Sequence, residues 1–225
     1  MRKAVLTDIE GTTTSLAFVK EVLFPYARQH ISGFVEAHAE DKEVAACVAE
    51  VRCLSERGEM TLREVGQCLV QWIDTDQKVT PLKTLQGLLW AEGYRQGRYY
   101  GHVYPDAVEC LRAWKAQGLS LSIYSSGSVL AQQLLFQHTE YGDLTPLFSG
   151  YFDTQVGGKK EQASYVSIAK HLGLLPEEIC FLSDIKEELE AAAACGYECV
   201  WLQRDGEIDS KAIPRQVKDF YALKF

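Results

Sequence analysis

The sequence predicts an α/β protein with a doubly wound, Rossmann-like parallel sheet and an all-helical domain inserted after the first strand. A short apolar run, Ala4 to Leu6, lies near the amino terminus and is followed by two carboxylates, Asp8 and Glu10. No strand pattern follows between about residues 18 and 98. From Pro105 onward, short apolar runs alternate with helical patterns, as in right-handed crossovers between parallel strands.

The first apolar run reads as a buried strand, and the turn after it contains Asp8, Glu10, Gly11 and three threonines. In open α/β sheets, ligands collect outside the carboxyl ends of the strands. An acidic pair at such an end is a candidate site for a hard cation and for carboxylate chemistry. At this point the plainer interpretation, that the pair only caps a turn, stays open.

The segment after this turn has helical periodicity. Apolar residues fall on one face over residues 18–34, with Pro25 inside the run, so we expect a kink or a break there. A second helix is expected over 41–57, with Gly58 as its stop.

Two more helices complete this segment. Thr61 opens one of them with a capping box, and Thr80 followed by proline opens the other, which we expect to end near Gly93. Helices of this kind can bury their apolar faces on one another. The sequence therefore predicts a helical domain over residues 17–100, inserted into a core that comprises 1–16 and 101–225.

The rest of the chain alternates between predicted strands and predicted helices. Strands are expected at 119–124, 151–153, 179–182 and 198–202, and helices at 106–117, 129–136, 162–172 and 187–195. The tail around Pro214 is expected to be a loop with a short edge element. Strands of this apolar character are buried on both faces of a parallel sheet.

Composition narrows the class of protein. The 225 residues are 47% hydrophobic and 24% charged, which suits a packed core. A net charge of −8 without a basic cluster argues against nucleic acid as a partner. We expect no membrane segment and a cytoplasmic location, because there is no signal peptide and no run of about 20 apolar residues. The seven cysteines lack a CxxC pair and read as reduced thiols.

Polar groups gather at the predicted strand ends. The first strand leads to Asp8 and Glu10, a later one to Ser125, Ser126 and a helix start, and another to Asp184, while Lys159 precedes a helix. Because parallel strands share one carboxyl edge, all of these should lie together. They supply a nucleophilic carboxylate, an acid/base, phosphate donors, a cation and a metal-binding carboxylate, as phosphoryl transfer through an aspartyl-phosphate requires.

This order of motifs resembles the haloacid-dehalogenase superfamily. Its first motif, Asp-x-Asp-x-(Thr/Val), stands here as Asp8-Ile9-Glu10-Gly11-Thr12, and Ser125, Lys159 and Asp184 match the other three, with Glu188 as the companion of Asp184. The resemblance covers the whole chain and implies the haloacid-dehalogenase type of core with an inserted helical cap.

Glu10 stands where most members of the superfamily have aspartate. With this glutamate and the stretches 18–20, 124–128 and 152–154, the sequence resembles the enolase-phosphatases of methionine salvage, although Gly158 replaces the histidine expected before the lysine. The resemblance implies that 2,3-diketo-5-methylthiopentyl-1-phosphate is enolised and then dephosphorylated to the acireductone. It also implies one Mg²⁺ per subunit, and we expect the chain to act as a monomer.

The resemblance implies a role for each matched residue. Asp8 would be the nucleophile and a Mg²⁺ ligand. Glu10 would supply a backbone carbonyl to the metal and a side-chain acid/base. The other implied roles are metal binding by Asp184, phosphate binding by Ser125 and the Ser126 backbone, and charge neutralisation by Lys159.

Several alternatives stay open on the sequence alone. A general small-molecule phosphatase, a phosphomutase or a non-catalytic phosphate-binding module would carry similar motifs, whereas a dehalogenase would need no metal site. Lys159 and Lys160 could be a solvated pair, Ser126 could be only a helix cap, and Glu187 and Glu188 could serve only the helix dipole.

Overall fold

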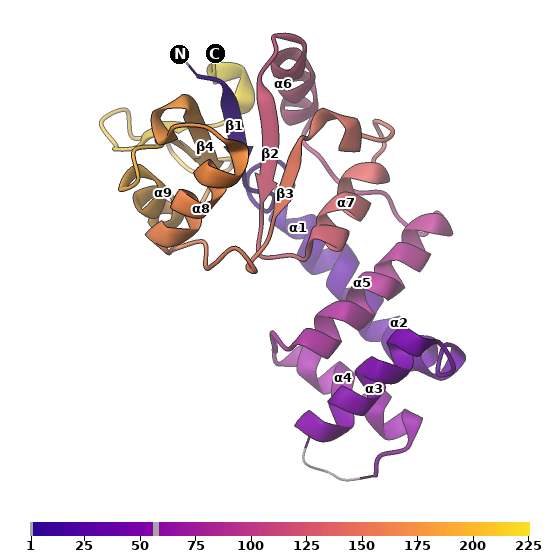
Figure 1. Cartoon of the computed structure of the whole chain (residues 1–225). Helices are drawn as coiled ribbons and strands as arrows, with labels where there is room; N and C mark the ends of the chain where they lie inside the picture. The colour runs from indigo at the N-terminus through magenta and orange to yellow at the C-terminus, as the bar shows by residue number, and fades with distance from the viewer. Residues whose placement is uncertain (1, 56–58) are drawn as a thin grey trace. The chain divides into compact units, whose positions relative to one another are not determined.

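The computed structural model describes residues 2–55 and 59–225, and its chain forms two compact units. One unit comprises residues 1–16 and 100–225, and the other comprises residues 17–99. The first contains a six-stranded sheet and the second contains helices (Figure 1). The described helices include none long and apolar enough to cross a membrane.

The sheet is parallel throughout and has the strand order β3-β2-β1-β4-β5-β6. The predicted fold class is therefore confirmed. The strands are β1 (Ala4–Thr7), β2 (Ser120–Tyr124), β3 (Gly150–Phe152), β4 (Ile179–Ser183), β5 (Glu198–Leu202) and β6 (Arg215–Val217).

Strand β1 is hydrogen-bonded on both sides, and all four of its residues are buried. Helices join the strands of this unit: α6 (Pro105–Ala116), α7 (Val129–Gln137), α8 (Gln162–Leu172) and α9 (Lys186–Ala193). On one side of the sheet, Leu6, Tyr124 and Phe181 from three strands pack with Tyr165 of α8 and Leu189 of α9. Burial on both faces explains why the two central strands, β1 and β4, are mostly apolar.

Short 3-10 helices lie in two connections of this unit, η2 (Thr145–Leu147) and η3 (Pro176–Glu178), and in its tail, η4 (Phe220–Ala222). The tail predicted as a loop with an edge element contains β6 and then η4, whose Phe220 is fully buried. The ring of Phe220 stacks on Trp114 of α6, with 5.4 Å between the ring centroids. The tail is thus packed into the core of the unit.

The helical unit contains four longer helices: α2 (Phe24–Ala37), α3 (Lys42–Leu54), α4 (Leu62–Asp74) and α5 (Thr80–Arg95). Their buried aliphatic residues form one core, which includes Ile31, Val51, Leu69 and Leu85. The predicted capping box is present at the start of α4: the Thr61 hydroxyl accepts from the Glu64 amide, and the Glu64 carboxylate accepts from the Thr61 amide.

The first helical segment does not break at Pro25: its backbone stays helical through a π-helical turn that lies just before the proline. A short helix, α1 (Leu16–Phe18), leads into a π-helical turn, η1 (Val19–Leu23), and α2 starts at Phe24 with Pro25 in its first turn. The Phe24 amide donates to the Val19 carbonyl, so α2 continues directly from the π-helical turn and Pro25 follows that turn without ending the helix.

Two predicted helix ends are wrong or lie outside the described residues. Helix α5 does not end near Gly93 but continues to Arg95, and Gly93 is buried within it. A Cβ at Gly93 would lie 2.6 Å from the hydroxyl of Tyr99, so this glycine makes room for an aromatic ring. Helix α3 ends at Leu54, and the predicted stop at Gly58 is outside the described residues.

Candidate active site

The pairing register brings the predicted site residues to one edge of the sheet. Thr7 of β1 pairs with Ile123 of β2 and with Leu182 of β4. Asp8 follows Thr7 directly, while Ser125 and Asp184 come two residues beyond their paired positions. All three therefore lie at the carboxyl ends of neighbouring strands, where α/β sheets bind ligands.

Lys159 connects two buried carboxylates. Its Nζ lies 2.6 Å from Oδ1 of Asp8 and 2.7 Å from Oε2 of Glu188. Oε2 of Glu188 also accepts a hydrogen bond of 2.9 Å from the Ser183 hydroxyl. Lys160, by contrast, is largely exposed, and its Nζ lies 3.8 Å from Glu187. The structure thus distinguishes the two lysines: Lys159 belongs to the site and Lys160 to the surface.

The charges of this group favour the ammonium form of the lysine. Burial by itself would favour the neutral amine of Lys159, but the Asp8 and Glu188 carboxylates outweigh it and raise its pKa. Burial raises the pKa of Glu188, and the nearby ammonium of Lys159 partly offsets that rise. A buried ammonium that touches two carboxylates can orient a carboxylate nucleophile and offset part of the negative charge at the site.

Asp184 is the carboxylate of the site that lacks a protein partner at one oxygen. Its Oδ1 is buried without a hydrogen bond, and its backbone carbonyl accepts from the Trp201 indole at 2.9 Å. Burial, and then the charge of Asp8, raise the pKa of Asp184 to about 7. An unpartnered buried carboxylate oxygen beside a second carboxylate is the arrangement that a bound cation would satisfy.

The turn after β1 is shaped to admit this carboxylate. Gly11 has a φ of +72°, and a Cβ placed on it would lie 2.2 Å from Oδ2 of Asp184. Only glycine provides both the left-handed backbone and the space for the carboxylate. Glu10, one residue earlier, is exposed, and its backbone bridges to Thr14.

A cation at this edge would have few protein ligands. In the described ranges 2–55 and 59–225, no three His, Cys, Asp or Glu side chains gather closely enough to hold a metal ion. Mg²⁺ is compatible with such a site, because it is usually bound by one or two carboxylates and keeps several waters. Asp8 and Asp184 are the carboxylates available, and the backbone carbonyl of Glu10 is a further candidate ligand.

The loop after β2 is built to present backbone amides. Ser125 is buried, and its Oγ accepts from the Gly127 amide at 3.3 Å. The cap of α7 is Ser128, whose hydroxyl accepts from the Ala131 amide. The interpretation of Ser126 as the helix cap is therefore wrong, and Ser126 lies exposed at the loop before a helix amino terminus, where anions bind.

Side chains to which the sequence analysis gave no role hold these loops. Buried Gln132 donates from Nε2 to the carbonyls of Gly127, at 2.8 Å, and Phe152, at 2.9 Å. The Tyr165 hydroxyl donates to the Lys159 carbonyl at 2.6 Å, and the Tyr124 hydroxyl donates to the Gly157 carbonyl at 3.0 Å. Their positions in apolar periodic segments predict burial but give no sign of these hydrogen bonds.

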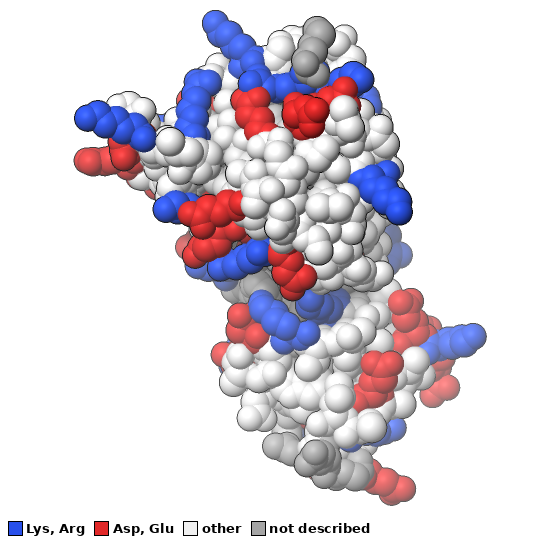
Figure 2. Space-filling model, turned by 60° about the vertical axis from the view of Figure 1, so that its left-hand side comes forward, with Lys and Arg blue, Asp and Glu red and all other residues white. Residues whose placement is uncertain are grey.

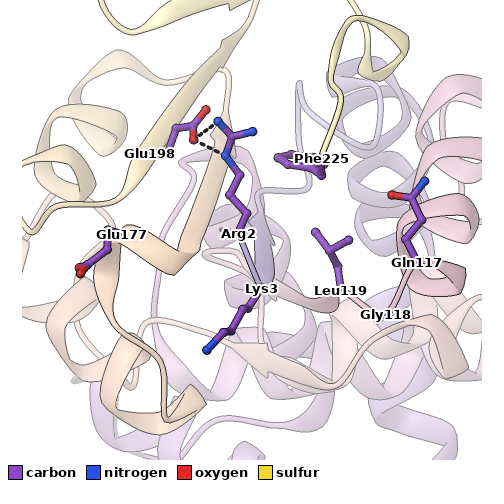
Figure 3. A pocket seen from close by; sticks show the side chains of 8 residues that line it. All are labelled: Arg2, Lys3, Gln117, Gly118, Leu119, Glu177, Glu198 and Phe225. Atoms are coloured by element: carbon purple, nitrogen blue, oxygen red, sulfur yellow. Dashed lines mark hydrogen bonds and ion pairs between the residues drawn. The ribbon is translucent and has the colours of Figure 1, made fainter.

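A separate cavity of about 830 Å³ lies at the opposite edge of the sheet (Figure 3). It is lined by residues at the amino ends of strands, among them Arg2, Lys3, Leu119 and Glu198. Both of its cations are paired, Arg2 with Glu198 and Lys3 with Glu178. On the face shown in Figure 2, basic and acidic side chains are likewise interspersed. Arg2 and Lys3 are each paired with one carboxylate and are far more exposed than Lys159, whose side chain is buried against two carboxylates.

Comparison with known proteins identifies the family to which the chain belongs. The model of the haloacid dehalogenase-like hydrolases matches residues 2–196, and the chain belongs to this family. A haloacid dehalogenase-type phosphatase from Thermococcus onnurineus, 19% identical over 98% of this chain and 95% of that one, has the same fold with a TM-score of 0.63.

Relatives with higher sequence identity show which group of these hydrolases the chain belongs to. Enolase-phosphatase E1 of Methylococcus capsulatus is 54% identical over 100% of this chain and 98% of its own length. Enolase-phosphatase E1 of Thioalkalivibrio sulfidiphilus is 55% identical over 92% of both chains. The UTR4 protein of Saccharomyces cerevisiae is 31% identical over 99% of this chain and all of that one, with a TM-score of 0.85. Within the hydrolases, the chain belongs to the enolase-phosphatase E1 family.

Proposed function

We propose that this protein is an Mg²⁺-dependent enolase-phosphatase of methionine salvage. Its substrate would be 2,3-diketo-5-methylthiopentyl-1-phosphate, which it enolises and then dephosphorylates to the acireductone. The observation that carries the proposal is the buried contact of Lys159 with Asp8, at the strand edge that also presents Asp184 and Ser125. The names and extensive identity of the relatives support the choice of substrate.

In the phosphatase step, a carboxylate oxygen of Asp8 attacks phosphorus, and the bond from phosphorus to the substrate oxygen breaks. Glu10 gives its proton to the departing oxygen. It then takes a proton from the water that hydrolyses the aspartyl-phosphate, which releases phosphate and restores the Asp8 carboxylate.

The other residues neutralise and orient the charged groups. The Lys159 ammonium balances charge on Asp8 and on the phosphoryl group, while the Ser125 hydroxyl and the Ser126 amide hold phosphate oxygens. Asp8, Asp184 and the Glu10 carbonyl would hold Mg²⁺, which supplies charge neutralisation between carboxylate and phosphate when bound.

For enolisation, the side chain of Glu10 is the candidate base. It is one methylene longer than the aspartate that most members of the superfamily have, so it can reach a carbon-bound proton as well as the leaving oxygen. The variant Glu10→Asp should slow formation of the enol, followed by its absorbance, more than it slows hydrolysis of an aryl phosphate. An unchanged enolisation rate would remove Glu10 from this role.

The deciding experiment supplies the diketo phosphate together with Mg²⁺. Release of phosphate with transient enol absorbance is expected, and Asp8→Asn should abolish the release. Phosphate release without an enol step would favour the second candidate, a general small-molecule phosphatase with the same strand-end residues. An absence of turnover on any phosphate ester would leave only a phosphate-binding protein.

A further inference from the structure

Arg204 holds the turn that carries the proposed catalytic carboxylates. This residue lies two positions beyond the end of β5, at the same edge of the sheet as Asp8. Its Nε and Nη2 both donate to the backbone carbonyl of Thr12, at 3.0 and 2.6 Å. Thr12 is completely buried, so no water replaces these donors.

The rest of the guanidinium is equally well fixed. Nη1 donates to both carboxylate oxygens of Asp106, at 2.9 and 2.8 Å, and Oδ2 of Asp106 also accepts from the Phe220 amide at 2.7 Å. The guanidinium carbon lies 4.1 Å from the centre of the Tyr104 ring. Arg204 thus ties the turn after β1 to the start of α6 and to the tail of the chain.

The hydrogen bonds within the turn do not use the Thr12 carbonyl, which accepts from Arg204 instead. The amides of residues 12, 13 and 14 all donate to the carbonyl of Ile9, and the Gly11 amide donates to the Thr14 carbonyl. The Tyr104 amide donates to the Thr13 carbonyl at 2.9 Å. The bonds to Arg204 therefore fix the peptide group that closes the turn after Glu10.

A buried ion pair is a poor way to gain stability alone, because removing two charges from water offsets their attraction. Arg204 and Asp106 both have side chains that are 9% exposed. We propose that Arg204 is a positioning residue, which holds the Thr12 peptide so that Asp8 and Glu10 keep their places at the strand edge. This inference rests on the proposed catalytic roles of those two carboxylates.

The test distinguishes the effect of the Arg204–Asp106 charges from the effect of the hydrogen bonds that Arg204 donates to the turn. The double variant Arg204→Met/Asp106→Asn removes both charges together, and the asparagine oxygen still accepts from the Phe220 amide. It should unfold at a somewhat lower temperature, because the buried Thr12 carbonyl loses both donors, and well below that temperature it should lose kcat for p-nitrophenyl phosphate by about 10- to 100-fold, with a smaller change in KM.

Two further variants complete the design. Arg204→Lys keeps the charge but cannot offer two donors to Thr12 while pairing with Asp106, so its kcat should fall between those of the unchanged protein and the double variant. The control, Arg2→Met/Glu198→Gln, removes an ion pair at the opposite edge of the sheet and should leave kcat unchanged.

Hydrogen exchange supplies a readout that does not depend on the proposed reaction. Amides of residues 8–15 should exchange faster in both Arg204 variants, whereas those of residues 157–160 should not. Unchanged kcat in the double variant or in Arg204→Lys, or an equal loss in the control, would overturn the positioning role. If the unchanged protein hydrolyses no phosphate ester, the proposed function fails, and faster exchange still tests whether Arg204 holds the turn.

Discussion

Replacing Gly11 by alanine should disable the site by displacing Asp184. The added Cβ would lie 2.2 Å from Oδ2 and 2.5 Å from Cγ of that carboxylate. Ordinary contacts between heavy atoms are about 3.5 Å or longer, so the carboxylate must retreat by roughly 1 Å. It cannot then stay where its unpartnered Oδ1 and Asp8 together suit a cation.

The expected effect of Gly11→Ala has two parts, a loss of folding free energy and a loss of reaction rate. The left-handed backbone at Gly11, with φ of +72°, costs an alanine about 1–2 kcal/mol of folding free energy. Displacement of a site group by about 1 Å can cost about 100-fold in rate. That factor corresponds to about 2.7 kcal/mol of transition-state stabilisation. We therefore expect a small fall in melting temperature and a large fall in kcat/KM, with weaker binding of Mg²⁺.

Gly142→Ala is the matched control. Gly142 has a φ of +84° and nothing within 4 Å of an added Cβ, so its alanine variant bears the backbone cost alone. Phosphate release from an aryl phosphate at several Mg²⁺ concentrations compares the two variants. Equal activity of Gly11→Ala and Gly142→Ala would refute the reasoning, because Asp184 would then tolerate displacement or play no part.

Three other predictions follow from contacts already described. Tyr165→Phe and Tyr197→Phe each remove one buried hydroxyl that donates to a carbonyl, at 2.6 and 2.8 Å, and each should cost about 1–3 kcal/mol in denaturant unfolding. Only Tyr165→Phe should also lower kcat, since its bond goes to Lys159; equal kcat losses would contradict this. The pKa of Asp184 is raised from an ordinary 3.8 to about 7, so the metal-free folded protein binds this proton more tightly than the unfolded chain does. The resulting gain in folding stability is fully present below pH 3.8 and is lost as pH rises through about 7. Calorimetric titration should accordingly show Mg²⁺ binding more tightly as pH rises through that interval, with proton release, and Asp184→Asn should remove the pH dependence. Thr61→Ala removes the capping box and should cost about 1 kcal/mol of stability without changing kcat; an unchanged unfolding midpoint would show that the cap is not needed.

The sequence was sufficient to bring together residues at the strand ends. Asp8, Ser125 and Asp184 are far apart in the chain, but parallel strands share one carboxyl edge, so knowing the strands is enough to gather them. Lys159 lies in a loop, and its buried contact with Glu188 depends on how α8 and α9 pack. Periodicity gave no measure of that packing.

Residues that act through backbone carbonyls were harder to find. Arg204 follows a strand end by two residues, so the same rule could have drawn attention to it, but its partners Thr12 and Asp106 lie in remote segments. Gly93 was misjudged for a similar reason. A glycine that follows a helical pattern often ends the helix, whereas this one is needed for close contact with the ring of Tyr99.

The central place of β1 has a consequence for synthesis of the chain. Its neighbour β2 starts at Ser120, and its neighbour β4 is complete only at Ser183. At about 5–20 residues per second, the ribosome needs roughly 9 to 35 seconds between the end of β1 and the end of β4. The helical unit, a continuous segment over residues 17–99, has all its residues well before then. The strand that leads to Asp8 therefore has both edges unpaired until β2 is translated and one edge unpaired until β4 is complete, and an unpaired edge is open to wrong pairing.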